Sequence, residues 1–194
     1  RVLVMSIYQN SWASSELPLL ASGTPIYNCN LAKTEHAAYL LVVNRGAVAG
    51  VNYGHSVYEY KNGTWSILLN NYVEPNATQT GIVGLDIEAE ENGTLYILTS
   101  DDAVTSGVYN LRLKKYDPVT KQWSTVGGNP LPLDFKTSTS TSVAISIAPD
   151  GTPFVAYRDE QDQDYPKVIY LDNETKQWSD PHKLADIASS NLNI

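Results

Sequence analysis

The four tryptophans of this 194-residue chain recur at nearly equal intervals. Successive spacings are 53, 58 and 55 residues, and the tryptophans are Trp12, Trp65, Trp123 and Trp178. The sequence around the last two is nearly copied, because residues 117–124 read DPVTKQWS and residues 172–179 read DNETKQWS, with six of eight positions identical. A period of this length is typical of repeat proteins. It constrains the fold more than any other feature, since each repeat must adopt the same local structure.

Each period predicts four short strands. In the clearest repeat, residues 82–90 alternate between apolar and polar side chains, Asn92-Gly93 forms a tight turn, and a second strand spans 95–99. Strands over 109–116 and 122–126 follow, joined by a turn with Pro118 at its second position. The next repeat predicts strands over 142–148, 153–157, 167–171 and from 177 onward. In the first repeat we expect the first strand from about 37 to 43, preceded by a long connection over 14–35.

Four-stranded antiparallel units repeated about every 55 residues predict an all-β fold, a β-propeller. The phase of the repeat gives about three and a half blades, whereas closed propellers usually have four to eight. Three arrangements follow: a fragment of a longer propeller, a four-bladed ring closed between the two chain ends, or a piece completed by another chain, such as a homo-oligomer. The expected layout is the end of one blade at 1–17, full blades at 37–69, 82–127 and 142–184, and a possible first strand of a further blade at 185–194.

One hairpin resembles a known family. Residues 115–123 read KYDPVTKQW, similar to the Tyr-Asp-Pro-x-Thr-x-x-Trp hairpin of kelch-type propellers, and residues 172–178 match it in part. The kelch double glycine is replaced by acidic segments at 100–102 and 158–160, so the resemblance implies a propeller with kelch-like hairpins rather than a kelch member. The sialidase-type Asp box, Ser-x-Asp-x-Gly-x-Thr-Trp, is not matched, because Asp150 is followed directly by Gly151. The recurring tryptophan predicts one large aromatic anchor between neighbouring blades.

Composition excludes several classes of function. The net charge is −8, with 13 scattered Lys and Arg against 21 Asp and Glu, so no basic surface is present for nucleic acid. No apolar run approaches the roughly 18 residues of a membrane-spanning helix, so we expect no membrane insertion. The single cysteine, Cys29, forms no internal disulfide, and with three His it predicts no zinc site. We expect a soluble protein without a cofactor.

Loop lengths place the expected binding surface. Within each repeat, the first-to-second and third-to-fourth connections are tight turns, so the opposite face carries the long loops on which binding sites usually lie. Two predicted second-to-third loops are acidic, and tyrosines lie nearby to stack on sugar rings. No loop has the spacing of a Ca²⁺ loop, so a calcium site has weak support. The candidate ligand-binding residues are Asp101, Asp102, Asp159, Glu160, Asp162, Asp164, Tyr165 and Tyr72.

Three carboxylates share one face of a predicted first strand, the strand that lines the channel of a propeller. They are Asp86, Glu88 and Glu90, and two carboxylates at a suitable distance can cleave a glycosidic bond by acid–base chemistry. The sequence places no His, Arg or Tyr clearly beside them, and it contains no nucleophile elbow and no phosphate-binding loop. The sequence therefore predicts no catalytic residue.

Four Asn-x-Thr sequons permit glycosylation, at Asn62, Asn76, Asn92 and Asn173. Together with the low charge and the lone cysteine, they favour an extracellular or cell-surface setting. We expect a non-catalytic module that binds carbohydrate or protein through the long-loop face. A structural subunit that assembles through open blade edges and a carbohydrate-active hydrolase are the alternatives.

Overall fold

The computed structural model describes residues 3–8, 11–16, 26–48, 51–73, 82–105, 108–128, 131, 143–159 and 162–185. These parts of the chain form strands and turns. The strands are β1 (Leu3–Tyr8), β2 (Ser11–Glu16), β3 (Ile26–Lys33), β4 (Ala38–Val48), β5 (Val51–Lys61), β6 (Thr64–Tyr72), β7 (Ile82–Ala89), β8 (Leu95–Thr105), β9 (Val108–Asp117), β10 (Gln122–Thr125), β11 (Val143–Ile147), β12 (Pro153–Asp159), β13 (Tyr165–Tyr170) and β14 (His182–Lys183).

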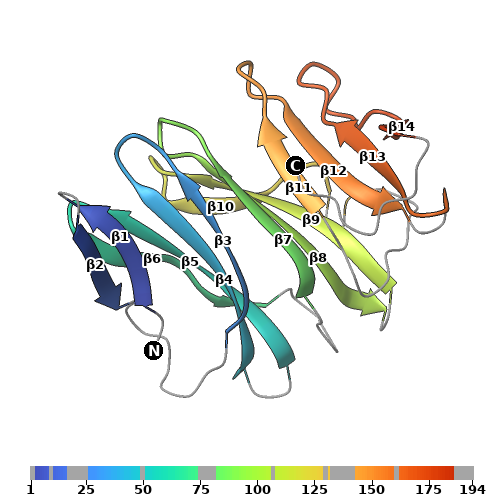
Figure 1. The fold of residues 1–194 in the computed structure, drawn as a ribbon. Coiled ribbons are helices and arrows are strands. Elements are labelled where there is room, and N and C mark those ends of the chain that lie inside the picture. The colour runs from blue at the N-terminus through green and yellow to red at the C-terminus, as the bar shows by residue number, and fades with distance from the viewer. Residues whose placement is uncertain are drawn as a thin grey trace.

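Consecutive strands pair antiparallel into separate sheets. One sheet has two strands, β1 and β2, and three sheets have four strands each: β3 to β6, β7 to β10, and β11 to β14. The sheets stand in a row in chain order, with β1 and β2 at one end and β11 to β14 at the other (Figure 1). This arrangement confirms the prediction of an all-β protein built from four-stranded antiparallel units.

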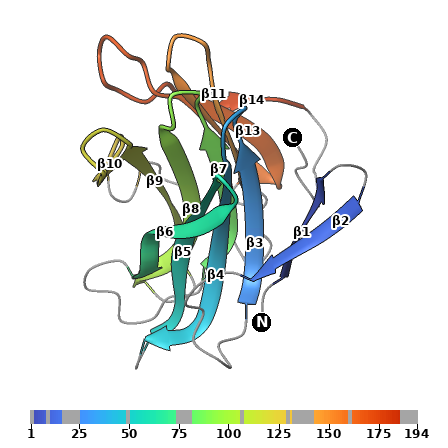
Figure 2. The ribbon, with the colours of Figure 1, turned by 90° about the vertical axis from the view of Figure 1, so that its left-hand side faces the viewer.

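The first strands of the three larger sheets adjoin one another. β3 contacts β7, and β7 contacts β11, although each belongs to a different sheet. Figure 2 looks along the row from the end that carries β1 and β2, with β3, β4 and β7 near the middle of the view. First strands gathered along one edge are the arrangement expected around the axis of a propeller. Side chains on β7 are therefore surrounded by three sheets.

Apolar side chains fill the space between neighbouring sheets. Tyr39 and Leu41 of β4 pack in one core with Leu85 and Ile87 of β7. A second core joins the next two sheets and contains Tyr96, Leu98, Leu111 and Leu113 with Val143, Ile145, Val155, Tyr157 and Ile169. Apolar side chains on both faces of the middle sheet are thus buried, Leu85 and Ile87 towards the preceding sheet and Leu98 and Leu113 towards the following one.

Two tryptophans reach back to the preceding sheet. The Nε1–H of Trp123 donates to the carbonyl of Leu68 at 3.2 Å, and the Nε1–H of Trp178 donates to the carbonyl of Gly127 at 2.9 Å. Trp65 packs against the core of its own sheet formed by Leu40, Val42 and Tyr58. The side chain of Trp12 lies outside the described residues.

The first four-stranded sheet begins earlier than the sequence predicts. β3 pairs with β4 through Asn30 and Leu41, so the segment expected to be a long connection contains the first strand, and the blade expected at 37–69 starts at Ile26. Thr34 closes the hairpin by accepting the N–H of Ala37 at 3.0 Å. The prediction failed because β3 carries polar residues and two exposed apolar residues, Tyr27 and Leu31, and so lacks the alternation of a half-buried strand.

A second correction concerns the predicted loop at 101–108. β8 continues to Thr105, and Asp101 pairs with Asn110 on β9, so Asp101 and Asp102 lie on a strand rather than in a loop. β8 and β9 pair in regular register from Leu95 and Tyr116 to Asp101 and Asn110, so the pairing extends into the segment predicted to be a loop. The side chains of both aspartates lie outside the described residues, as do residues 186–194 of the possible further strand.

Candidate functional site

Asp86 connects the first strands of three sheets. Its Oδ1 accepts the Nδ2–H of Asn30 on β3 at 2.6 Å and the backbone N–H of Ile87 at 2.9 Å. Its Oδ2 accepts the backbone N–H of Ile145 on β11 at 2.8 Å. Both carboxylate oxygens are therefore fixed, and the group sits where the three sheets meet.

The strand geometry explains this position. Leu85 and Ile87 point into the core shared with the preceding sheet, so Asp86 between them points to the opposite side of β7. β11 is the edge strand of its sheet, and an edge strand has N–H groups that its own sheet does not use. One of them, that of Ile145, donates to Asp86.

Burial raises the pKa of two carboxylates at this site, those of Asp86 and Glu88. Desolvation raises the pKa of Asp86, and the hydrogen bonds from Ile145 and Ile87 partly offset that rise. Desolvation also raises the pKa of Glu88, and the negative charge of Asp86 adds to the effect. The two residues share one face of β7 at a Cα spacing of roughly 6.6 Å, twice the rise per residue of a strand. A pair of this kind resists simultaneous ionisation, so one member holds a proton to higher pH.

An open cleft of about 560 Å³ lies beside Glu88, at the ends of β7 and β11. Its lining includes the apolar residues Ile147 and Pro149 and the carboxylates Glu90 and Glu91. The cleft opens on the face of the tight turns. The loop lengths in the sequence predict the binding site on the opposite, long-loop face. Carboxylates that line a cleft and have a raised pKa are candidates for a functional site.

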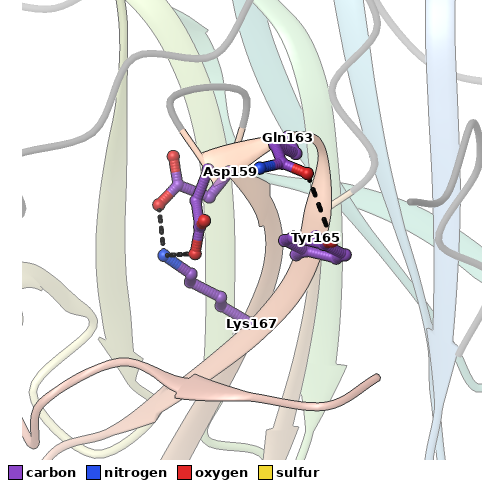
Figure 3. Close-up of polar contacts among 5 residues, drawn as sticks. Asp159, Gln163, Tyr165 and Lys167 are labelled. Atoms are coloured by element: carbon purple, nitrogen blue, oxygen red, sulfur yellow. Dashed lines mark hydrogen bonds and ion pairs between the residues drawn. The ribbon is translucent and has the colours of Figure 1, made fainter. Parts of the chain in front are cut away.

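The acidic residues predicted on the long-loop face form ion pairs within their own sheet. Lys167 Nζ lies 2.8 Å from Oδ2 of Asp159 and 2.8 Å from Oδ2 of Asp162 (Figure 3). Arg158 Nε lies 3.5 Å from Oδ1 of Asp164. Burial lowers the pKa of Lys167, but its bonds to the two aspartates raise it by more. These carboxylates are thus neutralised by cations of the same sheet.

The two predicted tyrosines are also engaged. The hydroxyl of Tyr165 donates to Oε1 of Gln163 at 3.2 Å, and the ammonium of Lys183 lies 3.2 Å from the ring centroid (Figure 3 shows the first contact). Tyr72 accepts a hydrogen bond from Lys114 Nζ at 3.1 Å and thereby joins the first two four-stranded sheets. Neither ring forms an open platform in this structure.

The remaining predicted residues are placed as follows. Glu160 and Asn76 lie outside the described residues. Asn62, Asn92 and Asn173 are exposed in turns, and Nδ2 of Asn173 donates to Oγ1 of Thr152 at 2.8 Å. Among the described residues, no group of three or more His, Cys, Asp or Glu is arranged to hold a metal ion. No helix in these parts of the chain has the length and apolarity needed to cross a membrane.

Comparison with known proteins identifies the fold. No family model matches the chain, and no curated protein matches it. Among solved structures, a Hadza microbial sialidase is similar with a TM-score of 0.57 at 10% identity, over 88% of this chain and 37% of that chain. An α-L-arabinanase from Penicillium chrysogenum gives 0.56 at 13% identity, over 85% and 51%. A fructan 1-exohydrolase from Cichorium intybus gives 0.52 at 14% identity, over 84% and 33%.

These similarities show a β-propeller fold, which confirms the predicted fold class. The chain spans between a third and about half of the length of these three proteins. No kelch protein is among the three, and the kelch-like character of the hairpins stays a prediction.

The comparisons also correct the expectation of a non-catalytic module. All three similar structures bear the names of carbohydrate-active enzymes, so this fold gives no reason to exclude catalysis. The sequence shows no partner beside Asp86, so it predicts no catalytic role for this residue. Its partners are Asn30, from a segment predicted to be a loop, and the backbone of Ile145, which has no sequence signal.

Proposed function

We propose that this chain is part of a carbohydrate-active hydrolase that works outside the cell, with Asp86 and Glu88 as its carboxylates at the propeller axis. The observation that carries the proposal is the position of Asp86, on a first strand between two neighbouring sheets, with both oxygens held. The raised pKa of Glu88 beside it, and the cleft onto which Glu88 opens, support the same reading. The fold of the similar enzymes makes a glycosidic bond the favoured target.

Each carboxylate has a distinct proposed role. Glu88, which lines the cleft and has a raised pKa, is the proposed acid and gives a proton to the glycosidic oxygen as the bond to the anomeric carbon breaks. A water molecule then adds its hydroxyl to that carbon and returns a proton to Glu88. Asp86 is the proposed anion of the pair, because its oxygens accept three N–H groups that partly offset the effect of burial on its pKa, and its charge stabilises the positive charge that develops on the sugar ring.

The test is turnover of a panel of aryl glycosides that covers sialosides, arabinofuranosides and fructosides. We expect release of the aryl group from at least one substrate, with Glu88→Gln lowering kcat by about 10²- to 10⁴-fold. Asp86→Asn should lower it as well, and circular dichroism should show that both variants keep the fold. Glu174→Gln is the matched control, because Glu174 is exposed and does not line the cleft beside Glu88.

Two results would contradict the proposal. One is a folded chain that turns over none of the panel. The other is turnover that Glu88→Gln and Glu174→Gln leave equally intact, since the axial carboxylates would then take no part in the reaction.

A further inference from the structure

A second cleft, of about 310 Å³, lies between the middle four-stranded sheet and the last one. The middle sheet contributes Tyr96 of β8 and Lys115 of β9 to its lining, and the last sheet contributes Gly151 and Lys176 from two of its turns. A Cβ added to Gly151 would meet nothing within 4 Å, so the space in front of this glycine is open. We call this site the lysine cleft, after Lys115 and Lys176.

The sign of its charge sets the lysine cleft apart. The cleft beside it is lined by three carboxylates, those of Glu88, Glu90 and Glu91, whereas none of the residues that line the lysine cleft is Asp or Glu. Two lysines therefore gather in one cleft of a chain whose net charge is −8. A cleft lined by one sign of charge attracts ligands of the opposite sign, so this one favours anions.

Neither lysine forms an ion pair within the described part of the chain. The carboxylates that feel their charge are Asp117 and Asp172, and each of these accepts N–H groups of its own turn. Those backbone bonds lower the pKa of both aspartates, and the charges of Lys115 and Lys176 lower it further. The two ammonium groups thus keep donors for an anion that enters the cleft.

Lys115 lies in line with the proposed acid of the neighbouring cleft. Glu88 pairs with Tyr96, and Tyr96 pairs with Lys115, so the three side chains share one face of the middle sheet. Two strand spacings place the Cα atoms of Glu88 and Lys115 roughly 10 Å apart. Nζ of Lys115 lies 5.3 Å from the ring centroid of Tyr96, the residue between them. One extended ligand on this face can therefore contact both clefts.

The repeat itself does not require a lysine at this position. Lys115 pairs with Ser124, next to Trp123, and the equivalent residue of the first four-stranded sheet is Glu59, which pairs with Ser66 next to Trp65. The same place in the repeat thus holds a cation in one sheet and an anion in another. Packing between sheets does not explain the cation, whereas a ligand does.

We propose that the lysine cleft binds an anionic group, a carboxylate or a sulfate, on a sugar unit of the chain that Glu88 cleaves, so that the substrate is an acidic glycan. The ammonium groups of Lys115 and Lys176 donate charge-assisted hydrogen bonds to the anion from the two sheets. The position of the cleaved bond rests on the hydrolase function proposed above, but binding of the anion depends on the lysine cleft alone.

The experiment is an NMR titration of the full chain carrying Glu88→Gln, so that no probe is hydrolysed. The probes are three disaccharides that differ only in one terminal sugar, which is glucuronic acid, glucose 6-sulfate or glucose. We expect the amide signals of Gly127 and Gly151, which line the cleft, to shift with a charged probe and not with the neutral one. Lys115→Met and Lys176→Met should each weaken binding of that charged probe about tenfold, because each removes a charge-assisted hydrogen bond.

Lys121→Met is the matched control. Lys121 occupies the same place in the preceding repeat as Lys176, is also exposed, and has φ of 56° against 58°, but it does not line the lysine cleft. Lys176→Arg keeps the charge and should retain binding. Circular dichroism should match the parent chain in every variant, and the exposed position of Lys176 keeps the test open if Lys115→Met fails to fold.

Three results would overturn the proposal: equal binding of the three disaccharides, no binding of either charged one, or lysine-cleft variants that bind as tightly as Lys121→Met. Binding of a charged disaccharide at this cleft by a chain that turns over no glycoside would support the anion site and contradict only the hydrolase proposal. The two proposals can thus fail separately.

Discussion

Gly127 offers a sharp test of the packing between sheets, because a side chain there would collide with a tryptophan anchor. Gly127 has φ of +70°, and a Cβ added to it would overlap the indole of Trp178, at 2.6 Å from Cε2 and 2.8 Å from Cζ2. The same glycine accepts the indole N–H at its carbonyl. Gly127→Ala therefore tests backbone conformation, packing and a hydrogen bond together.

The expected loss of stability can be estimated from these parts. An alanine in the left-handed region costs about 1–2 kcal/mol. Displacing the indole adds roughly 1–3 kcal/mol for overpacking. Weakening the bond from Trp178 to the carbonyl adds about 1 kcal/mol. We therefore expect Gly127→Ala to lower the free energy of unfolding by roughly 3–6 kcal/mol in total.

Gly151→Ala is the matched control. Gly151 has φ of +82°, and an added Cβ would meet nothing within 4 Å, so this variant should lose only the conformational part, about 1–2 kcal/mol. The assay is urea unfolding followed by tryptophan fluorescence and circular dichroism. A Gly127→Ala variant that is no less stable than Gly151→Ala would refute the reasoning, because Trp178 would then not press on Gly127.

Three further outcomes follow from the structure. Trp178→Phe should lose about 1 kcal/mol in urea unfolding, because the bond to the Gly127 carbonyl disappears while most of the ring packing remains. Lys167→Met should lower the free energy of unfolding by about 1–3 kcal/mol, because Asp159 and Asp162 would face each other without their shared cation. Lys167→Arg keeps the positive charge, so restored stability in that variant would identify the charge as the cause. The N–H groups of its turn lower the pKa of Asp172 below the value of 3.8 that it has in the unfolded chain. Its contribution to stability is therefore present above pH 3.8 and is lost as pH falls through the lower pKa of the folded state. The urea midpoint should drop across that pH range, and Asp172→Ala should make the drop smaller.

The fold could be predicted to the level of its repeat, but one strand could not. The repeats that contain Trp123 and Trp178 have clear turn sequences and a clear pattern of apolar residues. The pattern is clear because at least one face of each of their strands is buried. β3 contains Asn28, Asn30 and an exposed Leu31, and its place in the sheet depends on pairing with β4 rather than on its own residues. Pairing with a strong partner strand overrides weak local preference.

The candidate site was visible in part. Asp86 and Glu88 were recognisable as a pair on one face of a first strand, since alternation along a strand is a property of the local sequence. Their elevated pKa values come from burial among three sheets, and the groups that hold Asp86 come from positions 56 and 59 residues away in the chain. The acidic residues of the long-loop face show the reverse case: their number suggested a ligand site, yet Lys167 and Arg158 form ion pairs with Asp159, Asp162 and Asp164.

The sequence by itself determined the repeating unit, its four-stranded form and the tryptophan that marks each copy, because turns and alternation are set by residues close together in the chain. Only the tertiary structure decided which side chains meet between neighbouring sheets. Lys121 and Lys176 occupy the same position in two copies of the repeat, and nothing local separates them. Lys176 lines a cleft with Lys115 because two sheets stand side by side there, and that is a property of the assembled row.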